Sequence, residues 1–367
     1  MPAPRILAID VGTGTQDILV FEAGTLIENS VQLIMPSPTM QVADRVRAAT
    51  AARAGLLLTG RTMGGGPGHW AVEDHLKAGL RVYATPEAAR TFDDDLTRVE
   101  AMGVRVVDDG ESERLGGVCR IEFRDFQPEA VLSALKAFGV SGHFDAVAVA
   151  VFDHGAAPPG YSDRRFRFDY LRQQVARGAR LEAFGFMAGE VPERMTRMLA
   201  VVRSWSRDGA LFVMDTGPAA VLGALEDYRV RSERRAIVAN LGNFHALAFL
   251  LDEGRIAGLF EHHTGELTSE RLERYLDQLA DGTIDDQEVF ADMGHGALAP
   301  SRRLDPGFLA VTGPRRSLLQ GSRRRPYQAV PHGDMMLAGC FGLLRGLAAH
   351  RPDFKGPIEE ALGIPAF

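Results

Sequence analysis

Two stretches of the chain share one pattern and decide its fold. Residues 6–27 read ILAIDVGTGTQDILVFEAGTLI, and residues 236–257 read AIVANLGNFHALAFLLDEGRIA. Aligned without gaps, the strand-end Asp10 meets Asn240, and two glycines of each stretch coincide. Each stretch holds three apolar runs separated by two glycine-containing turns, which is typical of three antiparallel strands joined by tight turns. Two unrelated meanders would look similar, but the coinciding glycines favour a duplication.

The segments that follow each repeat predict an α/β unit in each half of the chain. In the second half they are a helix over about 268–281, strands over 307–312 and 326–330, and a helix over 333–349. In the first half they are strands over 56–59, 147–152 and 211–214. We therefore expect an α/β fold of two lobes. The first spans 1–228 with an insertion over about 61–143, the second spans 229–331, and helix 333–349 packs back on the first lobe.

Length and composition restrict the class of protein. The 367 residues fit two domains, and the net charge of −7 lacks the basic excess typical of nucleic-acid-binding proteins. The two cysteines, Cys119 and Cys340, are too few and too far apart for a disulfide framework or a four-cysteine metal site. We expect a reducing, cytoplasmic setting, and no membrane span, because no apolar run approaches about 18 residues.

The order of the motifs resembles that of the actin, hexokinase and Hsp70 superfamily. The matching segments, in chain order, are a first phosphate loop over 10–15, a connecting segment over 215–220, a second phosphate loop over 240–243, an adenosine-binding turn over 310–315 and a connecting helix over 333–346. This resemblance implies a duplicated, ribonuclease H-like actin-type fold with a central nucleotide cleft. It also implies ATP and Mg²⁺ as cofactors.

A second resemblance is narrower. The segments GRTMGGGPGHW (60–70), FDHGAAPPGYSDRRFRF (152–168) and FEHHTGEL (260–267) resemble a family labelled as similar to pyruvate formate-lyase activating enzyme. A radical activating enzyme needs a CxxxCxxC triad for its iron–sulfur cluster, and two isolated cysteines do not supply one. The label therefore does not predict the chemistry.

The phosphate loops carry the expected nucleotide and metal contacts. Asp10 ends a strand, where a carboxylate holds Mg²⁺ through water, and a turn rich in Gly and Thr presents backbone N–H groups to phosphate. The expected nucleotide contacts are Gly12, Thr13, Gly14, Thr15, Asn240, Gly242, Asn243, Gly313 and Pro314. Asn240 brings no charge to a metal, which leaves a weak or lost ATPase open. Simple hairpin turns are the alternative interpretation of both loops.

Polar residues at two other strand ends are candidates for catalysis and substrate binding. Asp215 follows an apolar strand and precedes a helix, so it is predicted to be a general base, or else only the cap of that helix. Asp153 and His154 follow another strand, and strand ends of α/β sheets line ligand crevices. Arg165 is predicted to grip an anionic substrate. A solvated loop is the alternative for all three.

Two adjacent histidines end the second repeat. His262 and His263 lie on a predicted strand, where neighbouring side chains point to opposite faces. They therefore cannot easily share one metal ion, and the sequence shows no third ligand at typical spacing. We expect one of them to face the cleft as a substrate ligand or an acid/base group.

These patterns lead to one functional hypothesis and two alternatives. The leading hypothesis is an ATP- and Mg²⁺-dependent phosphotransferase acting on a small, anionic metabolite, with Asp10 organising the metal and Asp215 activating the acceptor. The alternatives are an ATPase that activates or reactivates a partner enzyme, and a non-catalytic nucleotide- or metabolite-binding protein. Iron–sulfur activases of the superfamily hold a cluster between two subunits, so a homodimer also stays open.

Overall fold

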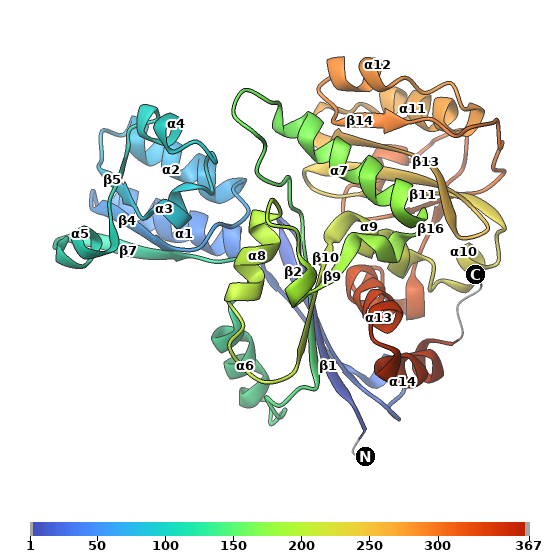
Figure 1. The fold of residues 1–367 in the computed structure, drawn as a ribbon, viewed down its shortest axis with the longest axis horizontal. Coiled ribbons are helices and arrows are strands. Elements are labelled where there is room, and N and C mark those ends of the chain that lie inside the picture. Colours follow the sequence, from blue (N-terminus) through green and yellow to red (C-terminus); the bar gives the residue numbers. More distant parts are fainter. Residues whose placement is uncertain (1–2, 364–367) are drawn as a thin grey trace.

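The first repeat forms one half of a mixed sheet in the computed structural model, which describes residues 3–363 (Figure 1). The strands β1 (Arg5–Val11), β2 (Thr15–Glu22) and β3 (Val31–Pro36) make an antiparallel meander. Two further strands, β8 (Ala146–Val151) and β10 (Ala210–Asp215), add in parallel beside β1. The short β9 (Gly185–Met187) closes the edge, giving the order β3-β2-β1-β8-β10-β9.

The second repeat builds a second sheet on the same plan. Its strands are β11 (Arg235–Leu241), β12 (His245–Asp252), β13 (Arg255–His263), β14 (Gly296–Leu298), β15 (Leu309–Thr312) and β16 (Tyr327–Gln328). Their order, β14-β13-β12-β11-β15-β16, again places a three-stranded meander beside two parallel strands, with one extra strand at an edge.

The first two strands of the meanders match, whereas the third strands differ, with six residues in β3 and nine in β13. The first strand of each has seven residues and the second has eight. Both hairpins are closed by the same backbone hydrogen bond, since the amide of Gly12 donates to the carbonyl of Thr15 and that of Gly242 donates to the carbonyl of His245, each at 2.9 Å. Two lobes of this topology confirm the predicted duplicated, actin-like α/β fold.

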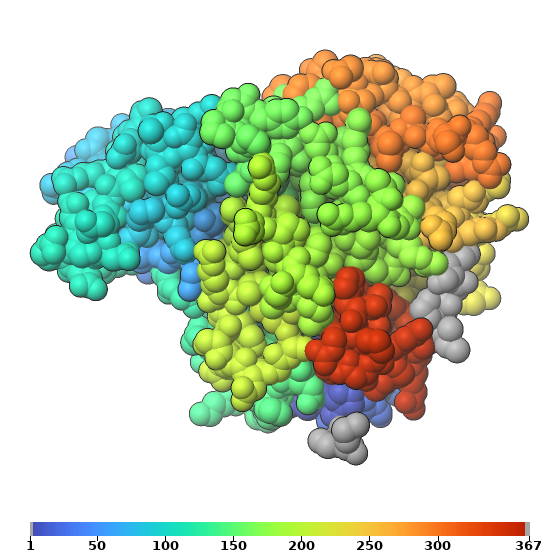
Figure 2. All heavy atoms as spheres, in the orientation of Figure 1, coloured from blue at the N-terminus to red at the C-terminus, as the bar shows by residue number. Residues whose placement is uncertain are grey.

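A third unit leaves the first lobe after β3 and returns at β8. It contains a parallel sheet of order β6-β5-β4-β7 with its own apolar core. Its elements are α1 (Pro38–Ala51), β4 (Gly55–Gly60), α2 (Pro67–Lys77), β5 (Val82–Ala84), α3 (Pro86–Ala89), α4 (Leu96–Ala101), β6 (Val104–Val106), α5 (Asp109–Arg114) and β7 (Val118–Phe123). The strand predicted over 56–59 is β4, so it belongs to this sheet and not to the first one. Figure 2 shows this blue and teal unit projecting from the rest of the molecule.

The remaining helices cover the faces of the two main sheets. They are α6 (Pro128–Ala137), α7 (Asp163–Gly178), α8 (Thr196–Arg203), α9 (Thr216–Ala224), α10 (Tyr228–Arg231), α11 (Ser269–Asp281), α12 (Asp286–Ala291), α13 (Ala338–His350) and α14 (Pro352–Leu362). The helix predicted over 333–349 begins only at 338, because His332 and Gly333 have positive φ angles of 48° and 81°. Among residues 3–363, no helix is long and apolar enough to cross a membrane.

Helices α9 and α13 cross almost backbone to backbone, and glycines permit this. A Cβ atom on Gly223 would lie 1.6 Å from the carbonyl oxygen of Ala338, and one on Gly342 would lie 1.9 Å from that of Ala219. On α13, a Cβ atom on Gly339 would lie 1.9 Å from a carboxylate oxygen of Asp10. The helix pair therefore fixes the C-terminal end of β1, where the first phosphate loop begins.

Candidate functional site

One cavity of about 210 Å³ gathers the predicted nucleotide residues of both lobes. Its lining includes Asp10, Gly12, Thr13, Gly14, Thr15, Asn240, Gly242, Asn243, Gly313 and Pro314. These residues come from the ends of β1, β11 and β15 and from the hairpin turns that follow β1 and β11. The duplication explains the convergence, since each lobe contributes the same edge of its sheet to the same space.

The loops of the two lobes approach each other closely. A Cβ atom on Gly14 would lie 2.8 Å from the side-chain nitrogen of Asn243. Gly313 has a φ of 96°, and a Cβ atom there would lie 2.7 Å from the side-chain oxygen of Asn240. The position of Gly313 therefore requires glycine, whereas a side chain at Gly14 would displace the amide of Asn243.

Two carboxylates face each other beside the first loop. The register of the β1–β2 hairpin places Asp17 opposite Asp10, and both line the cavity. An oxygen of Asp10 accepts a hydrogen bond from the hydroxyl of Thr216 at 2.6 Å. One oxygen of Asp17 is buried without a hydrogen-bond partner. The sequence analysis missed Asp17, although the two-residue turn after β1 fixes this pairing.

The protonation behaviour of this pair follows from its burial. Burial raises the pKa of Asp10 to about 6. Burial, reinforced by the negative charge of Asp10, raises the pKa of Asp17 to about 8. A divalent cation would neutralise the repulsion and occupy the unpartnered oxygen of Asp17, so oxygen ligands suited to Mg²⁺ are present here.

Replacing Asp17 with asparagine should stabilise the metal-free protein increasingly as pH rises. The wild-type carboxyl has a pKa of 3.8 when unfolded and about 8 when folded, so its contribution to stability is full below 3.8 and is lost as pH rises through 8. We expect Asp17→Asn to gain on the order of 2 kcal/mol over wild type between about pH 5 and pH 8. Urea unfolding in EDTA at several pH values measures this gain.

Asp44→Asn, at an exposed position outside both cavities, is the control for this pH series and should not reproduce the gain of Asp17→Asn. Adding Mg²⁺ at about pH 8 should stabilise wild type more than Asp17→Asn, because the variant lacks one carboxylate ligand. A gain for Asp17→Asn that does not change with pH would contradict the pKa assignment.

Asp215, which the sequence predicts to be a general base in the cleft, does not line the cavity. It is fully buried. Both of its oxygens accept hydrogen bonds from Arg167, one of them at 3.1 Å, and one also accepts from the amide of Gly217 at 3.2 Å. The structure thus shows the alternative role, the cap of α9. Its role as a general base stays a prediction and requires Arg167 to release it.

Arg167 makes hydrogen bonds to residues of β10 and β13 and to the segment that follows β8, behind the cavity. Besides Asp215, its guanidinium donates to both oxygens of Glu261, at 3.0 and 2.9 Å, and to the carbonyl of Asp153 at 3.2 Å. The ring of Phe152 lies 4.2 Å from it. The triad of Asp215, Glu261 and Arg167 is fully buried, so one guanidinium faces two carboxyl groups in the interior.

Asp153 and Arg165 also make structural contacts. The carboxylate of Asp153 accepts hydrogen bonds from the amides of Gly155 and Met198, both at 2.8 Å, so it fixes the loop after β8. Burial raises its pKa to about 6. Arg165 pairs with Asp286 at 2.7 Å and lines neither cavity described here, so it is not placed to grip a substrate. Its neighbour Arg164 is, because it faces a second cavity.

The second cavity, of about 490 Å³, lies between the third unit and the two lobes. The glycine loop 64–66 forms one wall, and His154 and His263 form part of another. It shares Thr13, Phe152, Phe244 and other residues with the smaller cavity, so the two spaces adjoin.

The paired histidines point apart, as expected for neighbours on a strand. His262 is buried, with its Nε2 3.6 Å from Asp292. His263 faces the second cavity, and its Nδ1 lies 2.8 Å from the carbonyl of Met293. The structure adds two histidines that the sequence analysis missed, His245 and His295, whose rings stand beside those of His154 and His263.

Fold and cavity together define a protein of the actin-like ATPase fold, with paired phosphate-type loops at the junction of its lobes. The profile of the family described as "Putative pyruvate format-lyase activating enzyme (DUF1786)" matches residues 63–318. The chain belongs to this family. None of the curated proteins compared with the chain matches its sequence.

Solved structures give distant likenesses. A ROK hexokinase from Thermus thermophilus is 13% identical over 93% of this chain and 98% of its own, with a TM-score of 0.33. A Ppx/GppA family member from Aquifex aeolicus is 11% identical over 100% and 91%, with a TM-score of 0.25. A ROK family transcriptional regulator, a homolog of the E. coli MLC protein, is 9% identical, with a TM-score of 0.26. There the match covers 69% of this chain and only 37% of the regulator.

Proposed function

We propose that the chain binds a nucleotide with Mg²⁺ in the smaller cavity and transfers a phosphoryl group to a small anionic metabolite in the larger one. The observation that carries this proposal is the meeting of two equivalent glycine turns in one cavity, next to the carboxylates of Asp10 and Asp17. Phosphoryl transfer depends mainly on positioning and on charge stabilisation, and these residues supply both.

Each part of the smaller cavity has a defined task in this proposal. The turns 12–15 and 242–243 orient phosphate oxygens through backbone N–H groups. Asp10 and Asp17 hold the cation, which would neutralise phosphate charge during transfer. Its volume of about 210 Å³ is below the ~300–1,000 Å³ of typical ligand pockets, so the lobes must separate to admit a whole nucleotide. Their closure then excludes water from the phosphates.

The lining of the larger cavity supports an anionic acceptor. Arg90 and Arg164 both line it, and neither has a carboxylate partner within salt-bridge distance among residues 3–363. Arg164 already donates to the carbonyls of Phe290 and Gly294, and Arg90 donates to that of Pro86, so their remaining N–H groups are the ones available to a carboxylate or phosphate group. The cavity also contains Asp93, Asp94 and Asp163. These acids restrict where an anion binds, because they repel it from one side of the space.

A second candidate function, nucleotide binding without turnover, is favoured by two observations. Arg167 occupies both oxygens of Asp215, so no free general base stands in the smaller cavity at this strand end. Asn240 occupies the place of Asp10 in the second lobe and brings no charge. A closed but catalytically silent cleft would serve as a nucleotide sensor.

Thermal unfolding with ATP or ADP and Mg²⁺ tests both functions. A ligand at a hundredfold its Kd that binds only the native state adds about 2.7 kcal/mol, and EDTA should abolish that gain. Formation of ADP and of free phosphate is then measured with and without carboxylated and phosphorylated metabolites. Acceptor-dependent formation of ADP without an equal amount of free phosphate supports phosphotransfer, and binding without formation of ADP supports the sensor. The absence of a nucleotide-dependent shift in folded protein would contradict both.

A further inference from the structure

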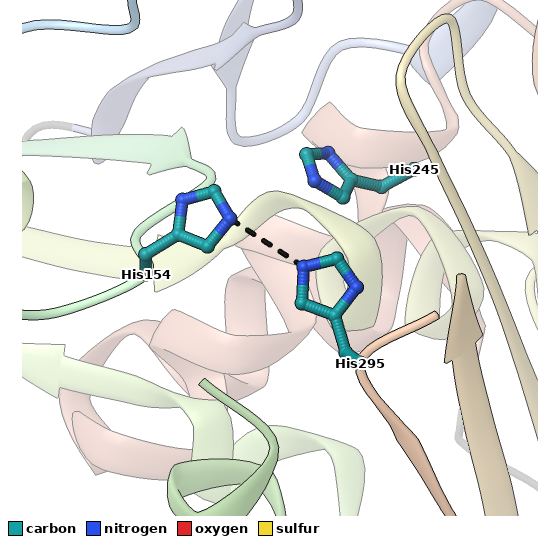
Figure 3. Close-up of side chains that lie close together, drawn as sticks. All are labelled: His154, His245 and His295. Carbon is teal, nitrogen blue, oxygen red and sulfur yellow. Dashed lines mark hydrogen bonds between the residues drawn. The ribbon is translucent and has the colours of Figure 1, made fainter. Parts of the chain in front are cut away.

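Three histidines from distant parts of the chain converge between the lobes (Figure 3). His154 follows β8 of the first lobe, His245 begins β12 of the second, and His295 precedes β14. One ring nitrogen from each lies within 4.8 Å of the others. The Nε2 atoms of His154 and His295 are 3.5 Å apart. Two nitrogens on one tetrahedral zinc ion are separated by about 3.3 Å, given Zn–N bonds of roughly 2.0–2.1 Å.

Two of the ring nitrogens have no partner. Nε2 of His245 and Nδ1 of His295 are buried and make no hydrogen bond within the described chain. A buried ring nitrogen without a partner is unfavourable, and a metal ion satisfies it on His245. The stacking of Phe152 on His245, with ring centres 3.8 Å apart, holds that imidazole in place. These are the features of a built site and not of a solvated cluster.

The charge state of the cluster suits a metal. Burial lowers the pKa of His154 to about 3, and it lowers the pKa of His245 and of His295 as well. The rings are therefore neutral at physiological pH, which is the form that binds metal ions. Of the nearby cations, Arg167 is paired with Asp215 and Glu261, and Arg197 is paired with Asp125. Arg164 faces the same cavity and donates to the carbonyl of Gly294, without a carboxylate partner among residues 3–363.

Glu261 lies near His295 without a hydrogen bond to it, at the place where an outer contact would form. Its carboxylate oxygen lies 4.0 Å from Nδ1 of His295, on the side of the ring opposite the Nε2 that faces His154. Histidine ligands commonly hold a carboxylate through the second ring nitrogen, which fixes the tautomer and strengthens the metal bond. A closure of about 1 Å would make this hydrogen bond. The same carboxylate also accepts a hydrogen bond from Arg167, so Glu261 contacts both the histidine cluster and the buried arginine.

We propose that His154, His245 and His295 bind a divalent transition-metal ion, with Zn²⁺ as the best-suited class. Imidazole nitrogens favour zinc and its neighbours over Mg²⁺ or Ca²⁺, so this site is chemically distinct from the carboxylate pair at Asp10. His154 and His245 line the cavity of about 490 Å³, which leaves the fourth position of the ion open to water or a ligand. His263 stands next to that position, 4.6 Å from His295 between ring centres.

The site also connects the two lobes. His154 belongs to the first lobe, whereas His245 and His295 belong to the second. A metal ion bound to all three would hold the lobes together at the edge of the smaller cavity. We therefore expect Zn²⁺ to raise the melting temperature of metal-stripped protein, with no nucleotide present.

Competition titration of metal-stripped protein with Zn²⁺ tests the site directly. We expect one ion per chain, and a loss of affinity of at least about 100-fold in His154→Ala and in His245→Ala. His143→Ala, at an exposed position outside the cluster, is the matched control and should bind as wild type does. Co²⁺ provides a second readout, since a three-histidine site gives visible d–d absorption that Zn²⁺ displaces.

The assay separates this inference from the proposed function, because it uses neither nucleotide nor turnover. Circular dichroism establishes that each variant is folded before its affinity is read. Absence of stoichiometric Zn²⁺ binding in wild type would overturn the proposal. Equal affinity in wild type, His154→Ala and His245→Ala would also overturn it, since the ion would then sit elsewhere.

Discussion

Replacing Arg167 with methionine should lower the free energy of unfolding by about 3–5 kcal/mol, the range found when one partner of a buried ion pair is removed. The arginine is fully buried and is the shared partner of Asp215 and Glu261, which are also fully buried. Methionine fills a similar volume, so the loss comes from two carboxylates left without a counter-ion. Urea unfolding followed by circular dichroism measures the difference.

The matched control is Arg165→Met, two residues earlier on the same helix. Arg165 pairs with Asp286, but both side chains remain partly exposed, at 18% and 23%. Water compensates such a pair, so we expect a loss of about 1 kcal/mol or less. Equal losses in Arg165→Met and Arg167→Met would show that the triad contributes no more than a surface ion pair.

At acidic pH, the free energies of unfolding of wild type and Arg167→Met should differ by less than they do at neutral pH. Burial raises the pKa of Glu261, and removal of Arg167 removes the charge that opposes this effect. In Arg167→Met the carboxyl of Glu261 would therefore take up a proton at a higher pH than in wild type. A protonated carboxyl needs no counter-ion, so the variant should lose least at acidic pH, provided that wild type is still folded there.

The repeat made the fold accessible from the sequence. A gap-free match of two meanders predicts two sheets of equal plan, and the strands that carry the match fall at equivalent positions. The strand over 56–59 was assigned to the wrong sheet for a physical reason. Apolar parallel strands look alike wherever they are buried, and only the path of α1 shows that β4 starts a separate sheet.

The convergence of the predicted loop residues on one cavity could be expected because each lies in a local motif. Glycine marks the turns at 12–15 and 242–243 in the sequence, and both turns line one cavity in the structure. Asp17 required one further step, the register of the hairpin. The relative positions of residues in a hairpin of known register can therefore be predicted without knowledge of the rest of the chain.

Other residues depend on contacts that no local pattern shows. The interaction of Arg167 with Glu261 spans 94 residues, and that of His154 with His295 spans 141. Sequence spacing gives no reason to expect a metal site at His262 and His263, and the two side chains point apart in the structure. The spacing did not show that three other segments would bring histidines to the same edge, because metal ligands from separate elements have no characteristic spacing.

Replacing Asp10 with asparagine should reduce Mg²⁺-dependent nucleotide turnover by about 10²–10³-fold, the loss typical of removing one electrostatic contact at a reacting centre. Asparagine keeps an oxygen that accepts from Thr216, so the local packing survives. It lacks the charge that a divalent cation needs, and Asp17 alone would hold the ion more weakly. Turnover and Mg²⁺-dependent thermal stabilisation by nucleotide are measured together. If the protein binds nucleotide without turning it over, the thermal stabilisation alone tests whether Asp10 holds the cation.

Stability separates this effect from misfolding. Burial raises the pKa of Asp10 to about 6, so its contribution to stability is lost as pH rises through that value. At about pH 7.5 without metal, Asp10→Asn should therefore melt at the same temperature as wild type or higher. Asp145→Asn, exposed just before β8 at the opposite end of the sheet, serves as the control and should retain full binding and turnover. Unchanged Mg²⁺ dependence in Asp10→Asn would show that Asp10 is not a metal ligand, because neutralising a carboxylate ligand weakens the binding of the cation.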